Sequence, residues 1–178
     1  MPAAPPAGLA RLNAADDRRA ADLLHEVCAA RSWARAVLAG RPYAAPEALY
    51  TASDAATAAL DDAGLDEAMA GHPPIGRPEP GDPASAREQR GMAGADAALR
   101  ARMTDLNLAY QERFGHVFLI CATGLTARQL HDAAAERLTR TPRQERATAR
   151  AELGRINRLR LARLVGAPAT PSPEGGPR

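Results

Sequence analysis

Lysine is absent from this sequence of 178 residues, so all 23 basic residues are arginine. A chain without lysine cannot form a lysine Schiff base, anchor pyridoxal phosphate or supply the lysine of a P-loop. Aromatic residues are also scarce, at 3% of the chain. The core is therefore expected to consist mainly of Leu, Val and Ala between closely packed helices.

Cysteine and long apolar runs are also nearly missing. Cys28 and Cys121 stand alone, without a Cys-x-x-Cys pair or a signal peptide, so both are predicted to be reduced and buried. The longest apolar run, 117–122, is far shorter than the roughly 20 residues that cross a bilayer. No spacing of His, Cys or carboxylates forms a metal signature. These absences predict a soluble, cytoplasmic protein that binds neither a membrane nor a metal.

The charges that are present almost cancel. The formal net charge is +2, from 23 basic and 21 acidic residues spread along the chain, which is too balanced for a nucleic-acid footprint. The last predicted helix is rich in arginine, with Arg155, Arg158, Arg160 and Arg163. These side chains could form a solvated face, a nucleic-acid face or the source of one guanidinium that holds a substrate.

Length and composition favour one helical domain. A chain of this size suits a single core, and its abundant alanine favours helix. The ends, 1–8 and 166–178, are rich in Pro, Gly and Ala and are predicted to be mobile tails around a domain of residues 9–165. Apolar spacing and capping residues predict helices over 13–30, 31–38, 46–62 with a break near Ser53 and a stop at Gly64, 65–70, 85–90, 96–113, 126–140 and 142–165.

One apolar segment does not fit this helical pattern. Phe118, Leu119 and Ile120 would suit a buried strand, but no second strand is available to pair with them. We therefore predict a buried extended connector.

A histidine in a loop is the first candidate for chemistry. His72 lies between Gly71 and two prolines, whereas His25, His116 and His131 lie in or at the end of predicted helices. Imidazole is the side chain that titrates unaided near neutral pH. A structural or solvent-facing histidine is the alternative.

A second candidate lies at a predicted helix start. Ser85 and Glu88 have the spacing of a capping box, which explains both residues without a ligand. The same helix start could instead hold an anionic substrate through its free backbone N–H groups. A capping box gives no role to the neighbouring Gln89.

The sequence contains three short motifs in a fixed order, followed by two residue pairs near its end. The motifs are Gly71-His72-Pro73-Pro74-Ile75-Gly76, Ser85-Ala86-Arg87-Glu88-Gln89 and 113–122 (Arg-Phe-Gly-His-Val-Phe-Leu-Ile-Cys-Ala), and the pairs are Glu152-Leu153 and Arg160-Leu161. Together they resemble the OHCU decarboxylases, in full 2-oxo-4-hydroxy-4-carboxy-5-ureidoimidazoline decarboxylases, from about Leu9 to Val165. The resemblance implies a compact all-α, single-domain bundle of about seven to nine helices, commonly a homodimer, that needs no cofactor. It also implies the conversion of OHCU to (S)-allantoin and CO2 in urate degradation, beside urate oxidase and hydroxyisourate hydrolase.

The resemblance also implies roles for particular residues. His72 is the implied proton donor and Glu88 the second catalytic group. The implied substrate contacts are Pro73, Ser85, Ala86, Arg87, Gln89, Phe118, Leu119, Ile120, Cys121, Ala122 and Arg160. The sequence departs from the family pattern at Gly124-Leu125 and Arg140-Thr141, where the family usually has Gly-Arg and Asn-Asp. The alternative function is a non-catalytic helical binding module that uses the arginine-rich last helix.

Overall fold

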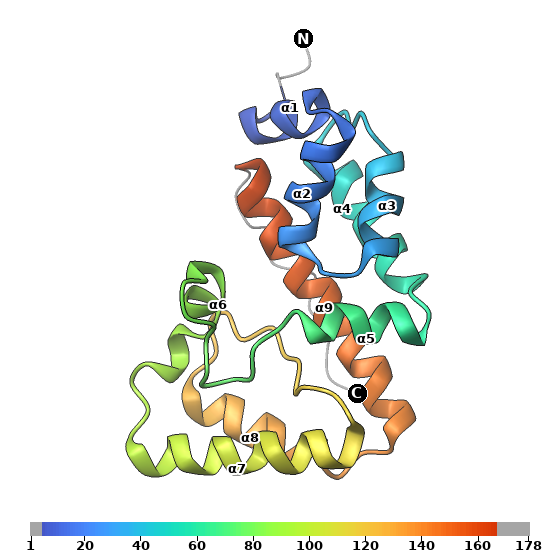
Figure 1. Ribbon diagram of the computed structural model, residues 1–178. Coiled ribbons are helices and arrows are strands. Elements are labelled where there is room, and N and C mark those ends of the chain that lie inside the picture. Colours follow the sequence, from blue (N-terminus) through green and yellow to red (C-terminus); the bar gives the residue numbers. More distant parts are fainter. Residues whose placement is uncertain (1–4, 167–178) are drawn as a thin grey trace. The chain divides into compact units, whose positions relative to one another are not determined.

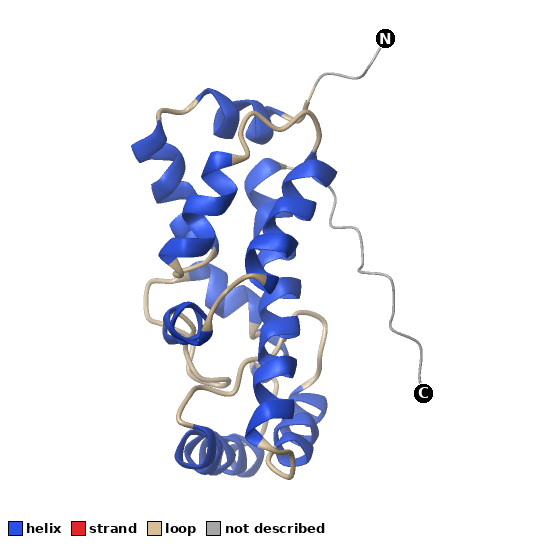
Figure 2. Ribbon diagram, turned by 90° about the vertical axis from the view of Figure 1, so that its right-hand side faces the viewer, coloured by secondary structure: helices blue, strands red, loops and turns tan. Residues whose placement is uncertain are grey.

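A computed structural model describes residues 5–166, in which every regular element is a helix (Figures 1 and 2), so the predicted all-α fold is confirmed. The elements are α1 (Ala7–Ala14), α2 (Asp17–Val27), α3 (Arg31–Ala39), α4 (Pro46–Ala58), α5 (Asp62–Ala70), α6 (Pro83–Glu88), the 3-10 turn η1 (Arg90–Met92), α7 (Ala97–Phe114), α8 (Ala127–Arg137) and α9 (Pro142–Val165). Among these helices, none combines the length and the apolar character that a membrane span requires.

The described chain divides into two compact units. The first unit contains residues 5–64 and 154–166, and the second contains Leu65–Leu153. The two divisions fall inside α5 and α9.

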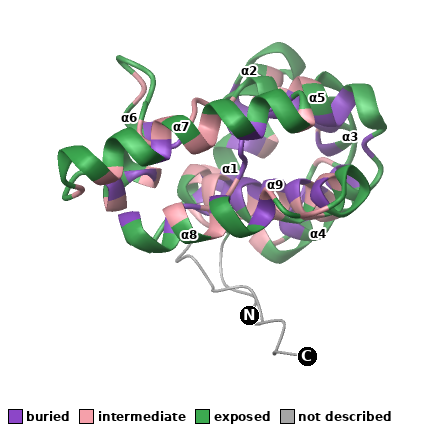
Figure 3. Cartoon of the chain, turned by 90° about the horizontal axis from the view of Figure 1, so that it is seen from below, coloured by how far each residue is buried: buried purple, intermediate pink, exposed green. Residues whose placement is uncertain are grey.

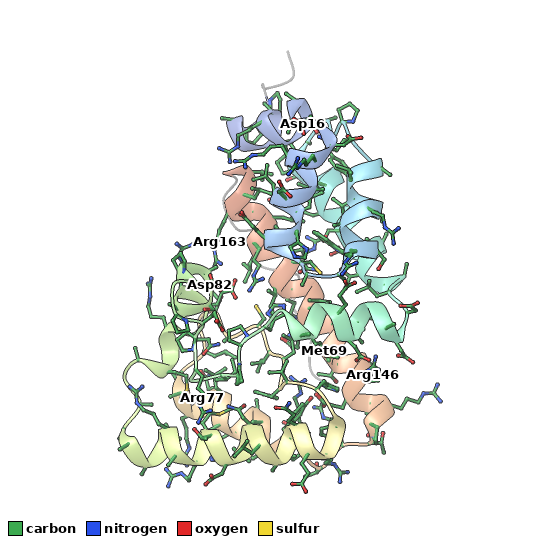
Figure 4. The ribbon with its side chains drawn as sticks, in the orientation of Figure 1. Asp16, Met69, Arg77, Asp82, Arg146 and Arg163 are labelled. Carbon is green, nitrogen blue, oxygen red and sulfur yellow. The ribbon has the colours of Figure 1, made fainter. Side chains whose placement is uncertain are left out.

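The first unit begins with a helix that overlaps the predicted N-terminal tail, 1–8. Helix α1 starts at Ala7 because Leu9 and Leu12 are buried and need a helical backbone to share one face. Asn13, expected to cap the next helix, lies inside α1 instead, and its amide pairs with the backbone N–H and carbonyl of Tyr43 at 2.9 and 2.8 Å. Asp16, labelled in Figure 4, caps α2. Its carboxylate accepts a hydrogen bond from the Arg19 N–H.

Two predicted breaks in the first half of the chain were wrong. Helix α4 runs unbroken through Ser53, which is fully buried one turn before the buried Thr57. Burial on the core face of a helix outweighs the local preference of serine for a cap. Gly64 does not end a helix either, because it lies in the first turn of α5 and donates its N–H to Asp61 at 2.7 Å.

The second unit is built around α7 and α8, which lie side by side (Figure 1). The predicted ends of these helices are confirmed: Gly115 closes α7 with a φ of +77°, and Thr126 forms a capping box with Gln129 at the start of α8. The helices show exposed and buried sides (Figure 3), and the buried sides meet in a core cluster. Its buried members are Ile75, Met92, Met103, Tyr110, Phe118, Ala122, Ala127, Leu130 and Ala134.

Gly91 is required by a close approach of backbone within this second unit. A Cβ at position 91 would lie 1.9 Å from the carbonyl oxygen of Leu125, so Gly91→Ala must displace main chain. We expect the variant to lose roughly 3 kcal/mol of unfolding free energy, measured by urea denaturation. Gly94→Ala is the matched control, because no atom lies within 4 Å of its Cβ, and it should change stability by about 0.5 kcal/mol or less. Equal losses in the two variants would contradict this account.

All three tyrosines have a pKa above the ordinary value. Burial is the main cause at Tyr43, Tyr50 and Tyr110, and a hydrogen bond to Glu145 adds to it at Tyr110. The folded state thus holds these protons more tightly than the unfolded state, in which phenols titrate near about pH 10. The resulting stability is complete below that pH and is lost as pH rises above it. In an alkaline titration, tyrosinate absorbance should therefore appear together with the loss of helical circular dichroism; tyrosinate formation near pH 10 with native dichroism would disprove this.

Candidate active site

The loop that holds His72 connects α5 to α6. It contains four prolines between residues 73 and 80, each of which lacks an N–H and fixes its own φ, so the segment cannot continue a helix. His72 itself donates its backbone N–H to the carbonyl of Met69 at 3.0 Å, which ends α5. Figure 4 labels Met69, in the last turn of α5, and Asp82, the residue before α6. The predicted loop is thus confirmed, although α6 already begins at Pro83.

The predicted capping box of Ser85 and Glu88 is wrong, because the cap of α6 is Asp82. The Asp82 carboxylate accepts from the N–H of Ala84 at 2.8 Å, and Pro83 occupies the first helical position. Ser85 is the third residue of α6, and its hydroxyl donates to the Asp82 carbonyl and accepts from the Glu79 N–H, both at 3.1 Å. Ser85 therefore ties the loop to the helix. Glu88 is half-buried at the last position of α6.

Gln89 joins the His72 loop to the end of α6. Its Oε1 accepts from the N–H of Gly76 at 2.8 Å, and its Nε2 donates to the carbonyls of Pro73 and Pro74 at 3.4 and 3.2 Å. The amide of Gln89 thus binds the loop through both its NH2 group and its oxygen. Only 7% of the residue is exposed. Since Pro73 follows His72 and Gln89 follows Glu88, these bonds hold the backbones of the two candidate catalytic residues close together.

The other candidate substrate-binding residues of the His72 loop and α6 are more accessible to solvent than Ser85 and Gln89. Pro73 is half-buried, and Ala86 and Arg87 are exposed. Arg87 and Ala86 therefore lie where a ligand could reach them, on a helix end that Gln89 fixes beside the loop.

The connector from Val117 to Ala122 has the predicted extended, non-strand backbone. Phe118, Leu119 and Ala122 are buried, whereas Ile120 and Cys121 are half-buried. Side chains hold this backbone from both directions: Arg137 donates to the Leu119 carbonyl at 2.7 Å, and Glu152 accepts from the Cys121 N–H at 2.9 Å. The middle of the connector is therefore fixed without a neighbouring strand.

A buried ion pair that no sequence motif predicts supports the connector. The Arg137 guanidinium binds the Glu145 carboxylate and lies 4.7 Å from the centre of the Phe118 ring. Tyr110 donates its hydroxyl to the same carboxylate. Both charged residues are almost completely buried. They lie on opposite sides of the α8–α9 turn and form no recognisable motif, so only the fold reveals the pair.

The other histidines and Arg160 have separate surroundings. His116 is buried against the rings of Tyr110 and Phe114, whereas His25 is exposed on α2 and His131 lies 2.9 Å from Asp132. Arg160 belongs to the first unit, where its Nη1 donates to the Val27 carbonyl at 3.1 Å.

An all-α chain with a proline-rich histidine loop tied to a short helix is the class of protein that these observations define. The family model described as OHCU decarboxylase matches residues 13–162. A 2-oxo-4-hydroxy-4-carboxy-5-ureidoimidazoline decarboxylase from Amia calva is 36% identical over 143 residues, 77% of this chain and 82% of that protein. The protein of the same name from Mus musculus is 33% identical over 140 residues, which are 75% of this chain and 79% of that protein.

A solved structure agrees with the sequence matches. The crystal structure of an OHCU decarboxylase in the presence of (S)-allantoin superimposes with a TM-score of 0.72 and 27% identity, over 85% of this chain and 99% of that one. The chain therefore belongs to the OHCU decarboxylase family, as its motifs predicted. These matches favour the enzyme over the helical binding module.

Proposed function

We propose that this chain is the carboxy-lyase that converts OHCU to (S)-allantoin and CO2 in urate degradation. Family membership over residues 13–162 is the observation that supports the reaction most directly. The hydrogen bonds from Gln89 to the His72 loop support the site, because they bring the two implied catalytic residues onto one fixed frame.

The substrate contains the electron sink that this reaction needs. The bond between C4 and its carboxylate breaks, CO2 leaves, and the electron pair forms a C4–C5 double bond while the ring imine takes up the displaced pair and a proton at nitrogen. The 4-hydroxyl then loses its proton as the C4 carbonyl forms, and C5 receives a proton on one face. One proton is consumed in all. The protein has to orient the ring and deliver the proton at C5.

In this proposal His72 gives the proton to C5. An imidazole has a pKa near neutral pH, so it can release a proton and regain one within each turnover. Glu88, half-buried at the end of α6, would accept a hydrogen bond from the 4-hydroxyl as that group loses its proton. Because His72 approaches C5 from one side only, a single enantiomer of allantoin forms.

The imidazoline ring of the substrate would lie between the His72 loop with α6 on one side and the connector on the other. We propose contacts from Pro73, Ser85, Ala86, Arg87 and Gln89, with Ser85 and Gln89 also fixing the loop. The connector residues Phe118, Leu119, Ile120, Cys121 and Ala122 would supply the other wall. Arg160 would bind an oxygen of the substrate, an interaction that must strengthen after CO2 leaves if it is to raise the rate.

The setting of the enzyme is part of the proposal. Urate oxidase and hydroxyisourate hydrolase would supply OHCU, and the active species would be a cytoplasmic homodimer. Analytical ultracentrifugation of the purified protein would measure its mass in solution and so test whether it is a dimer.

The test of the proposed function generates OHCU freshly from urate with urate oxidase and hydroxyisourate hydrolase, and then adds this protein. Circular dichroism should show (S)-allantoin appearing faster than in a sample with heat-denatured protein. Racemic allantoin formed at the uncatalysed rate would refute the proposal.

A further inference from the structure

We propose that Asn107 is a positioning residue for His72, a proposal that rests on the proposed function. Asn107 lies on α7 and belongs to none of the motifs identified in the sequence. Its Nδ2 donates to the carbonyl of Ile75 at 2.8 Å. Ile75 lies three positions after His72 in the same loop, so α7 holds the loop by a bond that does not involve α6.

The loop needs such a donor because of its prolines. Pro73 and Pro74 have no N–H, so this segment cannot build a regular backbone ladder. Two side-chain amides bind its successive carbonyls: Gln89 donates to Pro73 and Pro74, and Asn107 donates to Ile75. The Pro74 carbonyl also accepts the backbone N–H of Arg77 at 3.0 Å. The three peptide groups that follow Pro73, Pro74 and Ile75 are thereby fixed in orientation.

The side chain of Ile75 makes the Asn107 bond an anchor rather than a surface contact. Ile75 is 5% exposed and belongs to the core cluster of the second unit. Asn107 follows the buried Met103 by one helical turn, so it reaches the loop from the core side of α7. Ile75 is therefore held at both its side chain and its carbonyl.

The other end of the Asn107 amide supports a role beyond stability. Its Oδ1 is buried and has no hydrogen-bond partner among the described residues. Turning the amide over would place this oxygen against the Ile75 carbonyl, so the observed orientation is the favourable one. An orphan oxygen costs stability, and an apolar residue would avoid that cost. The benefit of asparagine here is the fixed loop.

The experiment compares Asn107→Ala and Asn107→Asp with Asn13→Ala. Aspartate has nearly the shape of asparagine but sets a carboxylate oxygen against the Ile75 carbonyl, so it tests the donor rather than the volume. Asn13 is the matched control, since it also binds backbone through its amide but lies in the first unit and touches Tyr43. Each variant is assayed at a temperature at which its circular dichroism spectrum shows that it is folded.

Both Asn107 variants should lower kcat roughly 10- to 100-fold, as expected for a displaced catalytic group, while KM changes little. The allantoin they form should also lose enantiomeric purity, because a displaced His72 protonates C5 less selectively. Asn13→Ala should keep the wild-type kcat and enantiomeric purity even if its stability falls. Equal kcat and purity in the Asn107 and Asn13 variants would overturn the proposal.

A second measurement is independent of turnover. The His72 ring signal in a proton NMR spectrum, identified by its loss in His72→Asn, should shift or broaden in Asn107→Ala and stay unchanged in Asn13→Ala. An unchanged His72 signal in Asn107→Ala would overturn the positioning role. Wild-type protein without decarboxylase activity would refute the proposed function instead, and the NMR comparison would still decide whether Asn107 fixes His72.

Discussion

Replacing His72 with asparagine is expected to slow the formation of (S)-allantoin by about 10²- to 10⁴-fold, the usual contribution of a general acid or base. Asparagine keeps a polar side chain in the loop but cannot transfer a proton near neutral pH. The loss should appear in kcat, because the proton is delivered in the reaction and not in substrate binding. The remaining product should approach a racemic mixture.

The chain offers a matched control for this variant. His25 is exposed on α2, so His25→Asn removes an imidazole without disturbing the His72 loop. Rates from freshly generated OHCU and unfolding curves of both variants separate chemistry from folding. A His72→Asn enzyme with wild-type kcat and full enantiomeric purity would exclude His72 as the proton donor.

The sequence predicted those features of the fold that depend on neighbouring residues. Gly115 ends α7 because only a residue without a Cβ adopts its φ of +77° cheaply, and Thr126 and Pro142 mark helix starts for equally local reasons. The loop around His72 followed from its prolines. The extended connector followed from the lack of a second strand.

The errors occurred where distant contacts compete with local preference. Ser53 and Ser85 both have the chemistry of a helix cap, but each is buried inside a helix that begins elsewhere. Asn107, Arg137 and Glu145 could not be identified, because their partners lie far away in the chain. The family resemblance implied which residues take part in the reaction, and the structure adds the hydrogen bonds from Gln89 and Asn107 to the loop that follows His72.

Removing one charge of the buried Arg137–Glu145 pair is expected to cause a large loss of stability. Glu145→Leu keeps a similar volume but leaves the Arg137 guanidinium buried without its counter-charge and the Tyr110 hydroxyl without its acceptor. Breaking such a pair typically costs about 3–5 kcal/mol. Urea unfolding should record this loss. Asp132→Ala is the control, because its carboxylate is exposed where it pairs with Arg128 and His131, and this variant should leave the urea unfolding curve almost unchanged.

The double variant Arg137→Met/Glu145→Leu distinguishes a charge effect from a packing effect. Once both charges are gone, no unpaired ion is buried, so the double variant should lose less stability than the sum of the two single variants. It should still have a lower kcat than wild type, because the Leu119 carbonyl loses the Arg137 donor that fixes the connector. Additive losses would show that the pair contributes through packing alone. A stable double variant with impaired turnover would show that this ion pair serves the geometry of the active site more than it serves the stability of the fold.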